Sequence, residues 1–178
     1  TLELKNGILD TFGHMMAAAS TLYDEDSNKP SVSASGSKTP WNLRTEIYNA
    51  VVEQPGRATV LDAYMTAKGT VYDSEFLVDL AKDMEKIDSW PLDVETEDPS
   101  KWGFNSITVR SQRPTHYLVG HSADPLAAVL HGMGNNPEAA LNYLSGGRVD
   151  EHGNWFLDDE TTKRWEMLEK RKWTAKTT

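Results

Sequence analysis

Cysteine is absent from the 178-residue chain. Without thiols the protein forms no disulfide bridge, no zinc site built on thiolates and no cysteine nucleophile. The absence leaves the compartment open, because exported and cytosolic proteins can both lack cysteine.

Long apolar runs and the patterns of common catalytic sites are also missing. A membrane-spanning helix needs about 18 consecutive apolar residues, and no such run occurs. The first residues lack the basic-then-apolar order of a signal peptide. Gly-x-Ser-x-Gly, Gly-x-x-x-x-Gly-Lys-Ser/Thr and His-Glu-x-x-His do not occur either. The chain begins at Thr1 instead of a methionine, so we expect a processed or excised segment of a larger protein.

Positive charge is in the minority. The chain has 18 lysines and arginines against 27 aspartates and glutamates, a net charge of -9. An acidic surface repels phosphate backbones, so we expect no nucleic-acid partner. The hydrophobic fraction of 38% is enough for one core, and we expect a single domain over residues 1–178.

Apolar residues recur at spacings of three and four along most of the chain. We therefore predict an all-α fold, an irregular bundle of about seven helices. The first is an amphipathic helix from Leu2 to Tyr23, in which Gly7 and Gly13 are predicted to mark the close approach of another helix. Its apolar stripe consists of Leu4, Ile8, Phe12, Met15, Met16, Ala19, Leu22 and Tyr23.

The serine-rich segment 27–40 has no apolar periodicity and is predicted to be a flexible loop. Two shorter helices follow, the first over residues 41–54 and the second ending at Gly69. The strongest helical pattern opens at Asp73 or Ser74. Its predicted inward residues are Phe76, Leu77, Leu80, Ala81, Met84 and Ile87.

The stretch from His121 to Leu144 contains two helix starts of the same design. The dipeptides Asp124-Pro125 and Asn136-Pro137 each place a side-chain acceptor beside a proline suited to the first helical position. Gly132 and Gly134 lie between the two patterns, so the first helix should stop there. We predict a tight helix-turn-helix hairpin whose purpose is packing.

Two segments depart from the helical rhythm. Residues 106–110 and 115–119 alternate in polarity, which fits either a small β-hairpin insert or an irregular one. His152-Gly153-Asn154 is predicted to form the tip of a small turn.

Asp158 or Asp159 should cap a last helix, with Trp165 and Leu168 facing inward. Basic residues gather in and after this helix, and we interpret them as a solvated face. They are Lys163, Arg164, Lys170, Arg171, Lys172 and Lys176.

Few residues suggest chemistry. His116, His121, Asp124 and His131 offer imidazole and carboxylate ligands that could converge on a metal ion. Their spacing matches no recognised site, and Asp124 is already explained as a helix cap. An acidic cluster invites a calcium interpretation, but the order of an EF-hand is absent and solvated charges are favoured. The cluster consists of Asp150, Glu151, Asp158, Asp159 and Glu160.

We therefore assign no catalytic, cofactor-binding or metal-binding residue from the sequence. The six tryptophans fall at predicted element ends or in turns, where aromatic side chains pin loops to a core or face a partner. They are Trp41, Trp90, Trp102, Trp155, Trp165 and Trp173.

Three stretches carry a resemblance to a known group of proteins: residues 72–77 (Tyr-Asp-Ser-Glu-Phe-Leu), residues 124–140, which include Asn-Pro-Glu-Ala-Ala, and residues 168–173 (Leu-Glu-Lys-Arg-Lys-Trp). Together they resemble an uncharacterised helical family of actinobacterial proteins, over roughly residues 50–173. The resemblance implies a domain of a long chain whose first part is similar to the secreted Trp-x-Gly helical hairpins of type VII secretion. It supplies no catalytic residue.

These observations favour a non-enzymatic helical scaffold or protein-interaction module of a larger secreted or envelope-associated protein, related to secretion or to a toxin. Its partner would be another protein or another domain of the same parent chain. A metal-assisted hydrolase using the three histidines and Asp124 is one alternative, and a structural subunit of a larger particle is another.

Overall fold

The computed structural model describes residues 2–22, 43–54, 56–88, 118, 120–149, 151–171 and 173. Within these residues it contains seven helices and two short strands, which confirms the predicted all-α fold. The helices are α1 (Leu2–Ser20), α2 (Leu43–Glu53), α3 (Arg57–Met65), α4 (Ser74–Asp88), α6 (Pro125–Met133), α7 (Pro137–Ser145) and α8 (Asp159–Lys170). The predicted loop 27–40 and strand 106–110 lie outside the described residues, as does all of the predicted strand 115–119 except Leu118.

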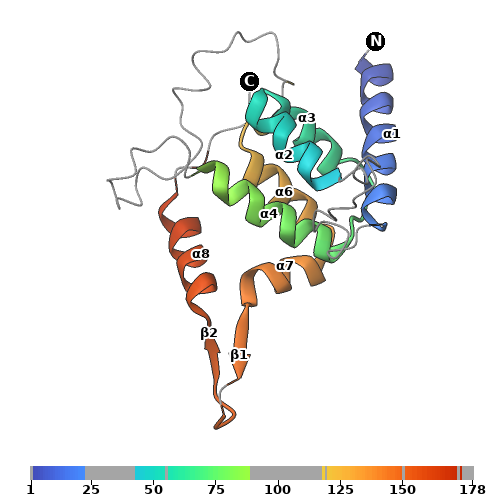
Figure 1. Ribbon diagram of the computed structural model, residues 1–178. Coiled ribbons are helices and arrows are strands. Elements are labelled where there is room, and N and C mark those ends of the chain that lie inside the picture. Colours follow the sequence, from blue (N-terminus) through green and yellow to red (C-terminus); the bar gives the residue numbers. More distant parts are fainter. Residues whose placement is uncertain are drawn as a thin grey trace, which may run out of the picture.

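Helix α6 forms the centre of the bundle and contacts α3, α4 and α7 (Figure 1). Its apolar residues Leu126, Val129 and Met133 are buried because they repeat at helical spacing toward these neighbours. All six predicted inward residues of α4 are buried too. Burial of each such large side chain contributes roughly 1.5–3 kcal/mol, so these two helices supply much of the core.

Side-chain caps start the helices where the sequence predicts them. The Asp124 carboxylate accepts hydrogen bonds from the first backbone N–H groups of α6, and Asn136 accepts one at the start of α7. Asp73 does the same for α4 through the Phe76 N–H. The Asn136 side chain also donates to the Tyr72 carbonyl oxygen at 2.8 Å, so the cap of α7 is tied to the segment before α4.

The predicted turn at residues 152–154 is confirmed, and it joins two strands. β1 (Gly147–Val149) and β2 (Trp155–Leu157) pair antiparallel, with Arg148 opposite Phe156. Gly153 has a φ of +80°, a conformation that glycine adopts without strain. The hairpin extends away from the helices toward the bottom of Figure 1.

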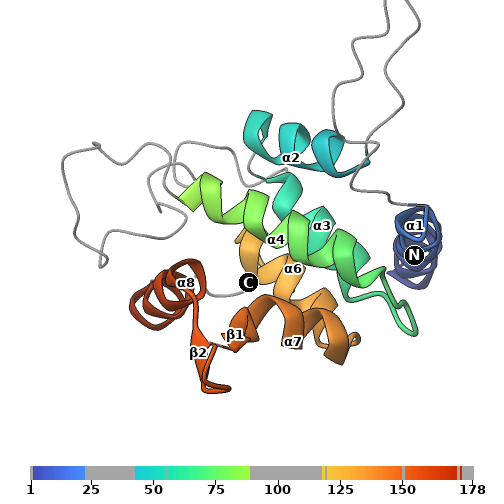
Figure 2. The same ribbon diagram turned by 60° about the horizontal axis from the view of Figure 1, so that its bottom comes forward.

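Helix α1 lies at one margin of the bundle against α3, with α8 at the opposite margin (Figures 1 and 2). Its inward residues are small: Gly13, Ala17 and Ser20 are buried. A β-carbon at Gly13 would lie 2.6 Å from the Ala67 β-carbon and 2.8 Å from the Tyr64 carbonyl oxygen. The predicted close approach at Gly13 is thus confirmed.

Two other predictions for the apolar residues and glycines are wrong. A β-carbon at Gly7 would meet nothing within 4 Å, so no helix approaches there. Trp165 is 46% exposed rather than inward, and its indole N–H donates to the Leu144 carbonyl oxygen. On α7, Ala139 and Tyr143 form the buried face, which leaves Leu141 exposed.

The two glycines of α1 give a matched test of this packing. Gly13→Ala should lower the free energy of unfolding by about 1–3 kcal/mol, since the added methyl group overlaps Ala67 and a backbone oxygen. Gly7→Ala should raise it by about 0.5–1 kcal/mol through helix propensity alone. Denaturant unfolding measures both, and equal effects at the two positions would contradict the contact between α1 and α3.

Candidate functional site

The outer face of α1 carries large apolar side chains that are not buried against any other described helix. We call Leu4, Ile8, Phe12, Met15 and Leu22 the outer stripe; their exposed fractions range from 48% to 84%. A surface helix ordinarily turns such residues toward the core and polar residues toward water. The fully buried residues of α1 are small instead. Of the outer stripe, Phe12 lies beside Tyr64 of α3, with ring centroids 6.1 Å apart, and most of the remaining apolar face is not covered by the described residues.

The outer stripe is large enough to matter. A half-exposed side chain of this size leaves on the order of 100 Å² of apolar area uncovered, so the stripe leaves roughly 500 Å². Contiguous exposed apolar patches of this extent are often functional and mark interaction surfaces. The stripe is therefore the first candidate functional site.

A second candidate is a buried carboxylate that binds two histidines. Asp62 on α3 is 2% exposed. Its Oδ2 lies 2.9 Å from His121 Nδ1 and accepts the Ser122 backbone N–H at 3.0 Å. Its Oδ1 lies 2.5 Å from His131 Nδ1 on α6. One side chain thus joins α3, the segment before α6, and α6 itself.

The chemistry of this cluster follows from its acceptor. A carboxylate oxygen accepts hydrogen bonds, so the geometry suits imidazoles that donate from Nδ1 to Asp62. A carboxylate that fixes the tautomer of a histidine occurs both behind metal ligands and in catalytic dyads. Within the described ranges, however, no three histidine, aspartate or glutamate side chains are placed to hold a metal ion.

The structure brings together only part of the metal site considered from the sequence. His121 and His131 do meet, but around Asp62, which the sequence argument missed. His116 lies outside the described residues. The one available signal for Asp62 was its position between two apolar residues, Leu61 and Ala63, which are both buried.

Asp124, the fourth member of that set, has a different partner. Its Oδ1 accepts a hydrogen bond from Arg171 Nη2 at 2.7 Å, and both side chains are completely buried. The same oxygen caps α6. The Arg171 guanidinium also lies over the Trp173 ring, 4.6 Å from its centroid. The interpretation of Arg171 as part of a solvated face is therefore wrong.

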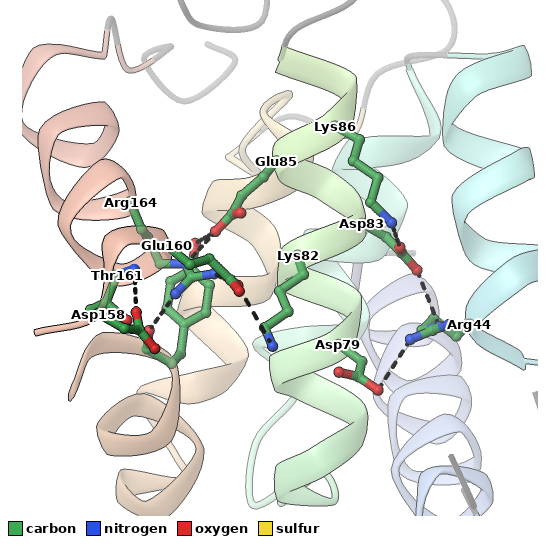
Figure 3. A network of polar contacts seen from close by, with 11 residues as sticks. Arg44, Asp79, Lys82, Asp83, Glu85, Lys86, Asp158, Glu160, Thr161 and Arg164 are labelled. Atoms are coloured by element: carbon green, nitrogen blue, oxygen red, sulfur yellow. Dashed lines mark hydrogen bonds and ion pairs between the residues drawn. The ribbon is translucent and has the colours of Figure 1, made fainter. Parts of the chain in front are cut away.

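Arg164 corrects the same interpretation. It is 5% exposed and donates at 2.6 Å to both Glu85 on α4 and Glu160 on α8 (Figure 3). Its guanidinium lies over the Tyr143 ring, and the Tyr143 hydroxyl donates to Glu85 as well. These contacts fasten α8 to α4 and α7.

Burial and the charges of this network shift the pKa values of its residues. Burial disfavours the charged form of Arg164, but its hydrogen bonds to Glu85 and Glu160 raise its pKa overall. The bond from Arg164 lowers the pKa of Glu160. Burial, followed by the Glu85 charge, raises the pKa of Tyr143, which stays a neutral donor.

The acidic cluster considered for calcium is mostly accounted for by these contacts. Asp158 caps α8 by accepting the Thr161 N–H at 2.7 Å, and Glu160 binds Arg164. Glu151 and Asp159 are exposed, as expected of solvated charges, whereas Asp150 lies outside the described residues.

With this geometry established, comparison with known proteins places the chain. The model of a family of unknown function, DUF6571, matches residues 5–178. The chain belongs to the DUF6571 family. No curated protein and no solved structure matches it. The family match agrees with the expected uncharacterised family and extends beyond residues 50–173, to include α1. None of the described helices of this DUF6571 domain is long and apolar enough to cross a membrane.

Arg171→Met tests the buried ion pair of the DUF6571 domain. Removing the cation leaves the Asp124 charge buried, so the free energy of unfolding should fall by about 3 kcal/mol or more. Lys170→Met, at the exposed neighbouring position, should change it by less than about 0.5 kcal/mol. Thermal unfolding compares the two variants. Similar losses for both would show that the Arg171–Asp124 bond contributes little.

Glu160→Gln tests the Arg164 network through pH. Because the folded state lowers the pKa of Glu160, its ionised form stabilises the protein at neutral pH, and this contribution disappears as the pH falls through that lowered pKa. The wild type should therefore exceed the variant in stability by about 0.5 kcal/mol near neutrality. The difference should shrink in acid. Exposed Glu169→Gln, on the same helix, serves as the control; a pH-independent difference for Glu160 would contradict the argument.

Proposed function

We propose that the domain is a non-enzymatic helical interaction module that binds another protein through the outer stripe of α1. One observation carries the proposal: the fully buried residues of α1 are small, whereas the five large apolar side chains of the outer stripe stay about half exposed or more. The described part of the domain leaves about half or more of each of these side chains exposed, so folding gains only part of the burial free energy that they could contribute. A bound partner would cover them and supply the missing burial free energy.

The remaining polar clusters support the same interpretation, because their bonds are internal. Asp62 orients two histidines and a backbone N–H, Asp124 caps a helix and binds Arg171, and Arg164 joins three helices. Each cluster connects elements that are distant in the sequence, so these residues stabilise the fold, as expected of a helical scaffold.

The wider setting is also a proposal. The resemblance of residues 72–77, 124–140 and 168–173 to actinobacterial proteins supports a place in a larger secreted or envelope-associated protein, related to type VII secretion or to a toxin. The partner would then be another protein or another domain of the parent chain.

Site-specific photo-crosslinking in the producing cells tests the interaction. A photoreactive amino acid replaces Met15 in the outer stripe or, as a control, Leu141 on α7, which is equally exposed. We expect a discrete protein adduct from position 15 and none from position 141. An added Ile8→Ser substitution should reduce the yield at position 15. The absence of an adduct at position 15, or equal yields at both positions, would contradict the proposal.

A further inference from the structure

The outer face of α1 contains a regular seam. Ile8, Met15 and Leu22 are seven residues apart, and so are Leu4, Thr11 and Ala18. All six are exposed. The N–H groups of Thr21 and Leu22 donate to the carbonyl oxygens of Ala18 and Ala19, so a helical turn continues beyond Ser20. Alternating steps of four and three are the pattern by which one helix packs along another.

We propose that this seam pairs antiparallel with the same seam of a second copy of the chain. The inference rests on the proposed function of the outer stripe and names its partner. A two-fold axis at the level of Gly13 would place Leu22 opposite Leu4, Met15 opposite Thr11, and Ile8 opposite Ala18 of the other copy. An isologous contact of this kind uses one surface patch twice.

The sizes of the side chains favour this direction. In the antiparallel pair the large Met15 and Ile8 meet the smaller Thr11 and Ala18, so the layers have similar volumes. A parallel pair would oppose each residue to its own copy, which sets Ala18 against Ala18 and leaves space in the seam. Phe12 borders the seam one residue from its centre, so the two Phe12 rings would also meet across the axis.

Charge favours a second copy at this face over an anionic membrane. The whole chain carries a net charge of -9, so two copies repel each other over most of their surfaces. Residues 2–22 contain only Glu3, Asp10 and Lys5 as charged side chains besides His14, so repulsion between two copies is weak at α1. A single lysine offers little attraction to acidic lipid headgroups.

The apolar area that the two copies would bury determines the expected affinity of the dimer. The two outer stripes together would bury roughly 1,000 Å² of apolar surface, near the lower limit for a specific interface. We therefore expect a reversible dimer with a dissociation constant on the order of micromolar, rather than a permanent one.

Sedimentation equilibrium of the 178-residue chain over a range of concentrations tests the proposal. The double variant Ile8→Ser with Met15→Ser should weaken self-association at least tenfold and keep the unfolding temperature, because both residues are exposed. The control Val71→Ser with Leu141→Ser changes apolar residues elsewhere that are at least as exposed and should leave association unchanged. A chain that stays monomeric to about 0.5 mM, well above the expected range, or an association that the seam variant leaves intact, would overturn the proposal.

Cysteine crosslinking tests whether the two helices pair antiparallel. The native chain has no cysteine, so only the introduced thiols can react. With a short bis-maleimide, a mixture of the Leu4→Cys and Leu22→Cys variants should give a covalent dimer, and neither variant should do so alone. A covalent dimer formed by the Leu4→Cys variant alone would contradict the antiparallel arrangement. Binding of the chain to phosphatidylglycerol vesicles in place of dimerisation would also overturn self-pairing. If the chain is monomeric but position 15 crosslinks to a different protein, the interaction module stands and only self-pairing fails.

Discussion

The carboxylate of Asp124 lies where the central helix begins and where the C-terminal segment returns to the core. It accepts the first backbone N–H groups of α6 and the guanidinium of Arg171, 47 residues further along the chain. A buried arginine is costly unless its charge is compensated, and a helix N-terminus favours a negative charge. The ion pair satisfies both conditions, so the start of α6 and the end of α8 are fixed by one interaction.

Helix α6 is held near its other end by a second buried carboxylate. Asp62 on α3 binds His131 in the last turn of α6 and His121 in the segment before it. The core helix is thus positioned by polar contacts at both ends and by apolar packing between them. Because a buried unpaired charge is expensive, these contacts specify one arrangement of α3, α6 and α8 more sharply than apolar packing alone.

Helix α1 obeys a different constraint. Gly13 permits its close contact with α3, and the Tyr72 hydroxyl lies 3.1 Å from the Gly13 carbonyl oxygen. The helix is therefore held by its small inner residues, by half-buried Met16 and by a few polar bonds, while most of the outer stripe stays exposed. The surface proposed for docking is thus separate from most of the stabilising contacts, so a partner could bind and leave it without disturbing the core.

The sequence by itself determined the helices, their caps and the inward face of α4, because these depend on spacing and on residues only a few positions apart. It also indicated a close approach at Gly7 and Gly13, since a glycine inside a helix costs free energy that close packing can offset, but only the tertiary structure decided that Gly13 alone is in contact. The partners of Asp62, Arg164 and Arg171 were decided only by the tertiary structure. The local sequences of Arg164 and Arg171 resemble solvated helix faces. Most groups that contact the three side chains come from elements 47 or more residues away, and the closer exceptions are Glu160, Tyr143 and Trp173. The tertiary structure also decided which face of α1 lies inside. Both faces contain apolar residues, but the close contact with Tyr64 of α3 and with Ala67 just after it leaves room only for small residues on the inner face.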